Sequence, residues 1–325
     1  MSKPKVFVTR IIPNKGLDLV MDFCDVDLWT NDLPPSRDEL LKRVKGVDGL
    51  LCLLTENIDS EVMDTAGPQL KVVSNYAVGF DNIDVVAATE RKIPVGNTPD
   101  VLTDATADFS FALMMSAGRR VLEGDRYVRE GKWMTWGPML FLGNEMRGST
   151  LGLVGFGRIG KAMARRAMGF DMRVIYYDPN EPRRDPDVKA VSVDFDTLLE
   201  ESDFISLHTP LTSDTHHLIN AETLNRMKPN TVLVNTSRGP VIDMDALYEA
   251  LRDRKIFAAG LDVTEPEPIP VDHPLLTLDN FIIAPHIASA SRSARDKMAW
   301  LAAKNLIAGL EGNHLPNCVN PQVHR

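Results

Sequence analysis

The segment Val154–Gly160 carries three glycines, Gly155, Gly157 and Gly160, in the spacing G-x-G-x-x-G. An apolar stretch typical of a strand precedes them, and a helical pattern over residues 161–170 follows. Glycines in this spacing allow a tight turn and let the backbone approach a pyrophosphate, whose charge then lies at the positive end of the helix. The context of strand, turn and helix therefore predicts a dinucleotide site. A glycine-rich turn without a ligand is the alternative interpretation.

The next predicted strand, residues 172–178, ends at Asp178, 23 residues after Gly155. This spacing is close to the ~20 residues at which an acidic side chain binds the hydroxyls of an adenosine ribose. Because a carboxylate also repels a 2′-phosphate, the sequence favours NAD(H) over NADP(H). Arg183 and Arg184 lie just beyond and would admit some NADP(H). An Asp followed by Pro179 is also ordinary turn chemistry, which is the competing interpretation.

Polar side chains at or just after three later strand predictions could do chemistry. Arg238 follows the predicted strand at residues 231–235. Asp262 ends the predicted strand at residues 258–262, and Glu267 comes five residues later. His286 follows the predicted strand at residues 281–285. The planar fork of an Arg binds a carboxylate through two hydrogen bonds. A His beside a carboxylate can protonate a carbonyl oxygen near neutral pH. Together they fit the reduction of a 2-oxo acid, although each alone could be a surface Arg, a solvated Glu or a core His.

The elements that would position these residues are short β-branched runs that alternate with helical patterns along the whole chain. This alternation predicts an α/β fold of two doubly wound parallel sheets, with ligands bound at the carboxyl ends of the strands. Helical spacing is found over residues 13–21, 36–44, 60–66, 103–122 and 291–309. Strands are predicted at residues 5–9, 25–29, 49–54, 70–74 and 93–97 in the first half, and at 149–157, 172–178, 204–208, 231–235, 258–262 and 281–285 in the second.

Composition excludes several classes of protein. The chain has 325 residues, of which 44% are hydrophobic and 25% charged, so it has the composition of an ordinary globular protein with room for two domains. Its formal net charge of −9 provides no general field for nucleic acid or an anionic membrane. Three cysteines far apart predict neither a disulfide nor a metal site. The apolar stretch at the amino terminus is too short for the core of a signal peptide, and no apolar run is long enough to span a membrane, so we expect a cytoplasmic protein.

Beyond these patterns, the chain resembles the D-isomer-specific 2-hydroxyacid dehydrogenases, and among them the glyoxylate/hydroxypyruvate reductases. The resemblance covers nearly the whole chain, and the motifs NTSRG, DVTEPEP and PHIAS together are highly specific. The matching segments are SNYAVGFDNID (74–84), VGNTPDVLTDATAD (95–108), LGLVGFGRIG (151–160), LHTPLTSDTHHLI (207–219), LVNTSRGPVID (233–243), GLDVTEPEPIP (260–270) and APHIASA (284–290).

The resemblance implies roles for individual residues. Arg238 would bind the substrate carboxylate and carbonyl, Glu267 rather than Glu265 would support the imidazole, and His286 would be the acid/base. Substrate contacts would come from Leu54, Val78, Gly79, Trp136 and Arg238, with Trp136 donated by a partner subunit. Asp262 would hold the nicotinamide carboxamide. The implied cofactor-binding residues are Thr103, Gly155, Phe156, Gly157, Arg158, Ile159, Gly160, Asp178, His208, Thr209, Pro210, Thr236, Ser237, Asp262, His286 and Ala288.

The resemblance also implies an interrupted domain order. A flavodoxin-like substrate domain would consist of residues 1–99 and 287–325, and a Rossmann NAD-binding domain of residues 100–286 would be inserted between them. Residues 121–148, rich in Trp, Met and Gly over 131–148, would form a dimerisation arm. Closure of the cleft between the domains would assemble the site.

Other functions remain open on the same fold. The chain could be a D-lactate, phosphoglycerate or phosphite dehydrogenase, although phosphite enzymes have a Lys where this chain has Val78. It could also be a non-catalytic NAD-sensing corepressor. Among the reductases, those that prefer NADPH often have Ser-Arg or Gly-Arg where this chain has Tyr177-Asp178, which again favours NAD(H).

Overall fold

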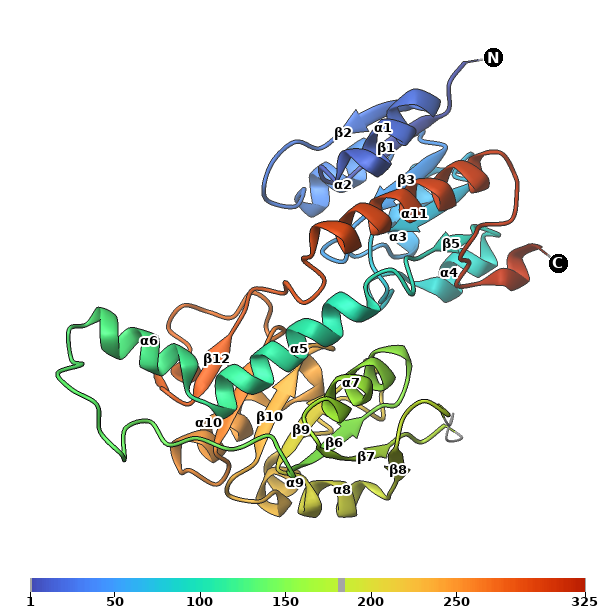
Figure 1. The fold of residues 1–325 in the computed structure, drawn as a ribbon. Helices are drawn as coiled ribbons and strands as arrows, with labels where there is room; N and C mark the ends of the chain where they lie inside the picture. The colour runs from blue at the N-terminus through green and yellow to red at the C-terminus, as the bar shows by residue number, and fades with distance from the viewer. Residues whose placement is uncertain (1, 181–184, 325) are drawn as a thin grey trace. The chain divides into compact units, whose positions relative to one another are not determined.

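The computed structural model describes residues 2–180 and 185–324, so Arg183 and Arg184, expected to influence the choice of cofactor, lie outside the described residues. The chain forms two compact units (Figure 1). Residues 1–102 and 290–325 form one, here called the split unit, and residues 103–289 form the other, the continuous unit. The boundaries between the units lie three residues later in the chain than the sequence predicted for its two domains.

The split unit is built on a parallel five-stranded sheet with the order β2-β1-β3-β4-β5. This is the flavodoxin-like order, in which helices cover both faces of the sheet. All five strands were predicted from the sequence. They are β1 (Lys5–Val8), β2 (Asp25–Leu28), β3 (Gly49–Cys52), β4 (Val72–Asn75) and β5 (Val95–Gly96), and the helices are α1 (Asn14–Phe23), α2 (Arg37–Arg43), α3 (Ser60–Ala66), α4 (Val85–Glu90) and α11 (Arg292–Leu310).

Helix α11, from the end of the chain, completes this unit by packing on α1 and on the sheet. It begins at its N-cap Ser291, whose side chain accepts a hydrogen bond from the Ala294 N–H. Gly16 of α1 lies so close that a Cβ there would be 2.2 Å from the Ala299 oxygen. Only glycine permits this approach, so the amino-terminal and carboxyl-terminal segments share one core.

The continuous unit contains a parallel seven-stranded sheet with the order β12-β11-β10-β9-β6-β7-β8. The six strands predicted for this half are confirmed, and the structure adds β8, which has no apolar run to reveal it. Because the strand order reverses beside β6, the carboxyl ends of β6 and β9 flank the crevice where nucleotides bind in such sheets. The strands are β6 (Thr150–Val154), β7 (Arg173–Tyr177), β8 (Ala190–Ser192), β9 (Phe204–Leu207), β10 (Val232–Asn235), β11 (Ala258–Leu261) and β12 (Phe281–Ile283).

Alternating strand residues of this sheet enter two separate cores. Val174 and Tyr176 of β7 pack into the core that includes residues of α5 and α7, whereas Ile175 packs into the core that includes α8, α9 and α10. Both faces of the sheet are therefore buried, as its continuous apolar strands require. The helices are α5 (Thr103–Gly118), α6 (Val121–Arg129), α7 (Arg158–Met168), α8 (Phe195–Glu201), α9 (Ala221–Arg226) and α10 (Met244–Arg252).

The single helix predicted over residues 103–122 is wrong at its end. Helix α5 stops at Gly118, and Arg120 adopts a left-handed conformation with a φ of 54° before α6 begins. The apolar pattern continues into Val121 and Leu122, but these residues are exposed on α6. Residues 131–148, the Trp-, Met- and Gly-rich part of the expected dimerisation arm, contain no helix or strand.

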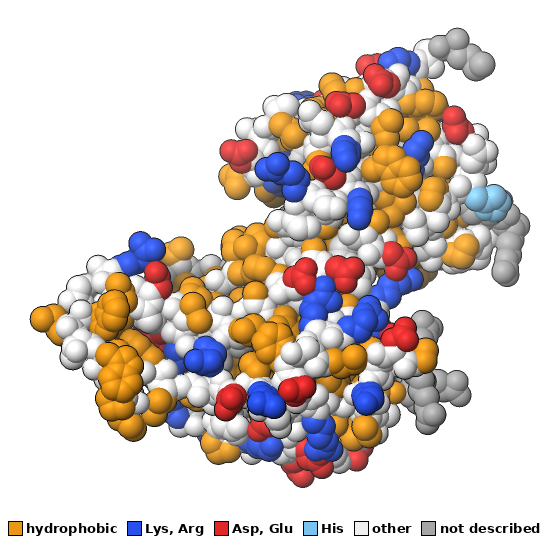
Figure 2. All heavy atoms as spheres, viewed as in Figure 1, with side chains coloured by type: hydrophobic (Ala, Val, Ile, Leu, Met, Phe, Trp, Pro, Cys, Tyr) orange, Lys and Arg blue, Asp and Glu red, His pale blue; other side chains and the backbone are white. Residues whose placement is uncertain are grey.

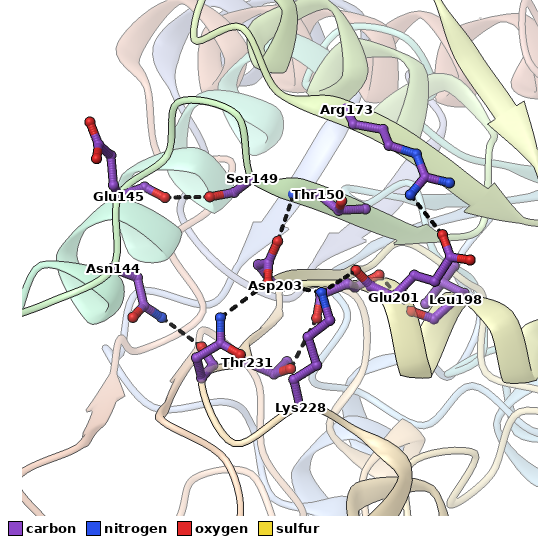
Figure 3. A network of polar contacts seen from close by, with 12 residues as sticks. Asn144, Glu145, Ser149, Thr150, Arg173, Leu198, Glu201, Asp203, Lys228 and Thr231 are labelled. Atoms are coloured by element: carbon purple, nitrogen blue, oxygen red, sulfur yellow. Dashed lines mark hydrogen bonds and ion pairs between the residues drawn. The ribbon is translucent and has the colours of Figure 1, made fainter.

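A polar network closes the amino-terminal edge of this sheet (Figure 3). The Asp203 carboxylate, which precedes β9, accepts hydrogen bonds from the Thr150 N–H at 2.9 Å, from Asn230 at 3.1 Å and from Lys228 at 3.0 Å. Burial raises the pKa of Asp203, but these hydrogen bonds outweigh it and hold the pKa below its usual value. The network joins the starts of β6, β9 and β10, opposite the edge where the predicted site residues lie.

Candidate active site

An imidazole and a carboxylate meet at the carboxyl-terminal edge of the seven-stranded sheet. Nδ1 of His286, three residues after β12, lies 2.6 Å from Oε1 of Glu267, which follows β11. The other carboxylate oxygen of Glu267 accepts a hydrogen bond from the Thr264 N–H at 3.3 Å. Burial raises the pKa of Glu267, but the hydrogen bond and charge of His286 outweigh it, and the pKa lies below its usual value. An ionised Glu267 therefore orients the ring and leaves its Nε2 for chemistry.

Asp262 holds the turn on which His286 is displayed. Its buried carboxylate accepts hydrogen bonds from the N–H groups of Ile287 and Ala288, both at 2.7 Å. Its backbone oxygen accepts the His286 N–H at 2.9 Å, and His286 has a φ of 54°. Burial raises the pKa of Asp262 even though these N–H groups oppose the shift. The sequence predicted a role in binding nicotinamide for this residue but not its contact with the histidine turn.

Arg238 follows β10, the strand beside β11, and its turn is held by Asn235. The Asn235 side chain accepts hydrogen bonds from the N–H and hydroxyl of Ser237 at 2.9 and 2.7 Å, and donates to the Arg238 backbone oxygen at 2.7 Å. The positive charge of Arg238 contributes to the lowered pKa of Glu267. The predicted set of Arg, Glu and His thus lies within electrostatic range at adjacent strand ends. The sequence placed Asn235 at a strand end but missed its function in holding this turn.

The glycine turn after β6 has the shape that a phosphate cradle needs. Gly155 has a φ of 92°, and a Cβ there would lie 2.6 Å from the His208 oxygen after β9. A Cβ on Gly160 would lie 2.2 Å from the Gly155 oxygen. At Gly157, the N-cap of α7, a Cβ would meet no atom within 4 Å and would fill the space before the helix. These residues therefore fit a dinucleotide whose pyrophosphate lies at the start of α7.

Asp178 lies at the end of β7 beside this turn and also helps to build it. One carboxylate oxygen accepts the Phe156 N–H at 2.9 Å, and the other accepts the Asn180 N–H at 3.0 Å. The Phe156 ring turns inward and stacks on Tyr176 with centroids 3.9 Å apart. An ionised carboxylate has about four acceptor positions, so Asp178 retains capacity for ribose hydroxyls.

His208, after β9, is a neutral group. Its Nε2 lies 2.9 Å from the Ser206 hydroxyl, and burial lowers its pKa to about 3. Thr209 is half-buried and Pro210 is exposed beside it. A neutral ring lets the chain pack closely against Gly155 without an uncompensated charge.

The remaining predicted cofactor residues take varied positions in the continuous unit. Thr236 is buried, and its hydroxyl lies 2.6 Å from that of Ser110 in α5, so this side chain is used within the fold. Thr103 and Ile159 are half-buried at the first turns of α5 and α7, and Arg158 is exposed. Of the predicted substrate residues, Leu54, Val78 and Gly79 are half-buried in loops of the split unit, and Trp136 is exposed in the arm.

His216, His217 and Glu265 place their potential ligand atoms within 4.8 Å of one another, a grouping that the sequence did not predict. The two rings are stacked with centroids 4.0 Å apart and planes 22° apart, and Nε2 of His217 lies 2.9 Å from Glu265. Imidazole lone pairs lie in the ring plane, so near-parallel rings at this separation do not direct them at one ion. The arrangement is a stacked pair with a hydrogen bond rather than a metal centre.

The fold and the site define the class of protein: an α/β oxidoreductase with a pyridine-nucleotide domain and an Arg, Glu and His set at its strand ends. Residues 111–288 match the model of the D-isomer specific 2-hydroxyacid dehydrogenase, NAD binding domain. The chain belongs to the D-isomer specific 2-hydroxyacid dehydrogenase family. Among the described residues, no helix has the length and apolar character to cross a membrane.

Relatives match along almost their whole length. A glyoxylate reductase of Korarchaeum cryptofilum is 55% identical, with 99% of this chain and 97% of the relative covered. A crystal structure of a Thermus thermophilus protein has a TM-score of 0.92 at 49% identity, covering 97% of this chain and 99% of that one. An NADPH-dependent glyoxylate/hydroxypyruvate reductase of Sinorhizobium meliloti, solved with NADP and malonate, has a TM-score of 0.86 at 31% identity, with 98% of each chain covered.

Proposed function

We propose that the protein transfers hydride from NAD(P)H to a small 2-oxo acid, reducing glyoxylate to glycolate and hydroxypyruvate to D-glycerate. The observation that carries this proposal is the 2.6 Å pair of His286 and Glu267, with Arg238 close enough to lower the pKa of that carboxyl. The names of the relatives, which include glyoxylate and hydroxypyruvate reductases, support these substrates.

The residues of the chain supply binding and a proton. A reduced nicotinamide, when bound, supplies the hydride. Arg238 binds the substrate carboxylate and polarises its carbonyl group through the guanidinium fork. Because Glu267 accepts the hydrogen bond from Nδ1 of His286, the protonated ring can donate from Nε2 to the carbonyl oxygen. Glu267 then stabilises the orientation of the neutral ring until it is protonated again.

The proposed cofactor is NAD(H), with NADP(H) possible. Asp178 supports this choice because its carboxylate lies against the glycine turn, where it would repel a 2′-phosphate. The continuous unit, residues 103–289, would bind the cofactor. The split unit would form the substrate domain, contributing Leu54, Val78 and Gly79. A cytoplasmic location is part of the proposal.

The partner proposed for residues 121–148 is a second copy of this chain. Large apolar side chains gather on this arm, and Figure 2 shows such side chains clustered where Figure 1 places α6 and the following segment. Trp136 is 77% exposed, an unfavourable position for a large apolar ring unless a partner covers it. Trp136 would then line the substrate pocket of the partner. The other exposed apolar residues of the arm are Val121, Leu122, Val128, Trp133, Met134, Met139, Leu140 and Leu142.

The activity is tested by following NADH and NADPH oxidation with glyoxylate, hydroxypyruvate, pyruvate and phosphohydroxypyruvate, and NAD⁺ reduction with phosphite. Fastest turnover with glyoxylate or hydroxypyruvate supports the proposal. Preference for another compound would reassign the protein to a D-lactate, phosphoglycerate or phosphite enzyme. Binding of NADH without turnover of any compound would favour a non-catalytic NAD sensor.

Light scattering of a Trp133→Glu, Met134→Glu variant tests the dimer, since a charged arm should yield monomers.

A further inference from the structure

Two consecutive peptide groups in the loop after β4 have their carbonyl oxygens held from the same side. The Ala77 oxygen accepts a hydrogen bond from the Thr98 N–H at 2.8 Å. The Val78 oxygen accepts one from the side-chain amide of Asn97, also at 2.8 Å. The adjacent residues Asn97 and Thr98, just after β5, therefore fix both peptide planes.

This arrangement determines where the next two N–H groups point. In a planar trans peptide the N–H is directed opposite to the carbonyl oxygen. The N–H groups of Val78 and Gly79 therefore both face away from residues 97–98, on one side of the loop. Throughout residues 2–180 and 185–324, no acceptor takes a hydrogen bond from either group, and both residues are half-buried rather than enclosed. Two adjacent N–H groups with a common direction form a site for a carboxylate.

We propose that Asn97 is a positioning residue for the substrate carboxylate. It acts through the Val78–Gly79 peptide, which it orients so that the Gly79 N–H stays beside the Val78 N–H. The inference rests on the proposed function, in which a 2-oxo acid binds this backbone. Neither the family resemblance nor the motif spacing assigned a role to Asn97.

Asn97 is well suited to this task because its own backbone is anchored. Its carbonyl oxygen accepts a hydrogen bond from the buried Asn305 of α11 at 2.8 Å. Gly96 lies against the same side chain, where a Cβ would be 2.7 Å from that of Asn305. On the far side of the pair, Asn75 donates to the Gly79 oxygen at 2.9 Å and limits rotation of the following peptide. The amide of Asn97 is thus a fixed donor on a rigid strand end.

Loss of this amide should weaken binding of the carboxylate more than it slows the chemical steps. In Asn97→Ala the Val78–Gly79 peptide loses the hydrogen bond that orients it, and about one substrate hydrogen bond is lost on average. We expect KM for glyoxylate to rise about tenfold, with kcat changed less than about threefold. In Asn97→Asp the side chain has nearly the same size, but a carboxylate would face the Val78 oxygen, and KM should rise further.

The test compares wild type, Asn97→Ala, Asn97→Asp and the control Asn313→Ala, whose residue is exposed after α11. Steady-state kinetics with glyoxylate are combined with calorimetric titration of NADH, and of oxamate into the NADH complex; thermal unfolding verifies that each variant is folded. A rise in KM and in the oxamate Kd of both Asn97 variants, with an unchanged NADH Kd, supports the proposal. A folded Asn97 variant with wild-type KM and oxamate affinity would overturn it. Wild type that turns over no 2-oxo acid would instead refute the proposed function on which it depends.

Discussion

Each edge of the seven-stranded sheet has a carboxylate that accepts several hydrogen bonds, but the two carboxylates serve different functions. At the amino-terminal edge, Asp203 accepts hydrogen bonds from a backbone N–H, an amide and an ammonium group (Figure 3). At the carboxyl-terminal edge, Glu267 accepts hydrogen bonds from one backbone N–H and from the imidazole of His286. Both carboxyl groups have pKa values below the usual range, and both oppose the effect of burial with hydrogen bonds.

A lowered pKa therefore does not distinguish a structural carboxylate from a functional one. The group that donates a hydrogen bond to the carboxylate does distinguish them. The partners of Asp203 are a backbone N–H, an amide and an ammonium group, which link the starts of neighbouring strands, so the network only holds strands together. The partner of Glu267 is an imidazole with a second nitrogen, which can pass a proton onward. Parallel strands bring both sets of loops together, but only the carboxyl-terminal loops lie beside the nucleotide crevice.

The largest effect should come from removing the proton donor at the carboxyl-terminal edge. We expect His286→Ala to lower kcat with glyoxylate by about 10²–10⁴ at pH 7, because the substitution removes the Nε2 proton donor. Stopped-flow or steady-state oxidation of NADH measures the change. The side chain is only partly buried, so the unfolding midpoint in urea should move little. Wild-type turnover in this variant would show that another group supplies the proton.

The opposite edge should show the reverse behaviour. Asp203→Ala leaves the Thr150 N–H without its acceptor and removes one of the two acceptors of the Lys228 ammonium, at a cost of about 2–3 kcal/mol in the free energy of unfolding. Urea titration followed by circular dichroism measures this loss, and kcat/KM at 25 °C should stay within about twofold of wild type. A large loss of activity in a folded Asp203→Ala variant would contradict the division between the two edges.

Asp178 is a mixed case, because it belongs to the carboxyl-terminal edge and also holds the glycine turn. Asp178→Ser should shift the ratio of kcat/KM for NADH over NADPH by about 10–100-fold toward NADPH, since the charge that repels a 2′-phosphate is gone. Asp178→Asn is the matched control, because its amide oxygen can still accept the Phe156 N–H. If both variants shift the ratio, charge is the cause; if neither does, the residue does not discriminate the cofactors.

Much of the fold was predictable because apolar runs reveal buried strands. Strands β6, β9 and β10 are entirely buried and were found from the sequence. In contrast, β8 is three residues long with two exposed, so it leaves no apolar signal. The end of α5 was missed because Arg120, which has no special preference for a positive φ, interrupts the helix there. Its conformation depends on tertiary contacts that a local pattern does not contain.

The candidate site was predictable to the extent that it follows from parallel strands. Arg238, Glu267 and His286 come after β10, β11 and β12, which are neighbours in the sheet, so their convergence follows from the topology. The supporting contacts were not predictable. Asp262 binds N–H groups 25 and 26 residues away, and Asn97 binds a carbonyl 19 residues away. Such pairings depend on loop conformations that no spacing rule specifies.

The smallest expected effect concerns His208. This residue lies at the carboxyl-terminal edge, but its substitution should change stability, as at the amino-terminal edge, rather than catalysis. Its pKa is lowered to about 3 by burial, so the unfolded chain, with an ordinary pKa near 6.5, binds more protons in the interval between these values. Its neutral form therefore contributes stability that is fully present above pH 6.5 and is lost as the pH falls toward 3. Between pH 7 and pH 5 we expect about 1–2 kcal/mol of this loss in wild type, and His208→Gln should lack it.

Urea titrations at the two pH values measure the difference, with His216→Gln, at an exposed position, as the control that should keep the wild-type dependence. An equal pH dependence in His208→Gln and wild type would mean that the folded protein accommodates a charged ring beside Gly155.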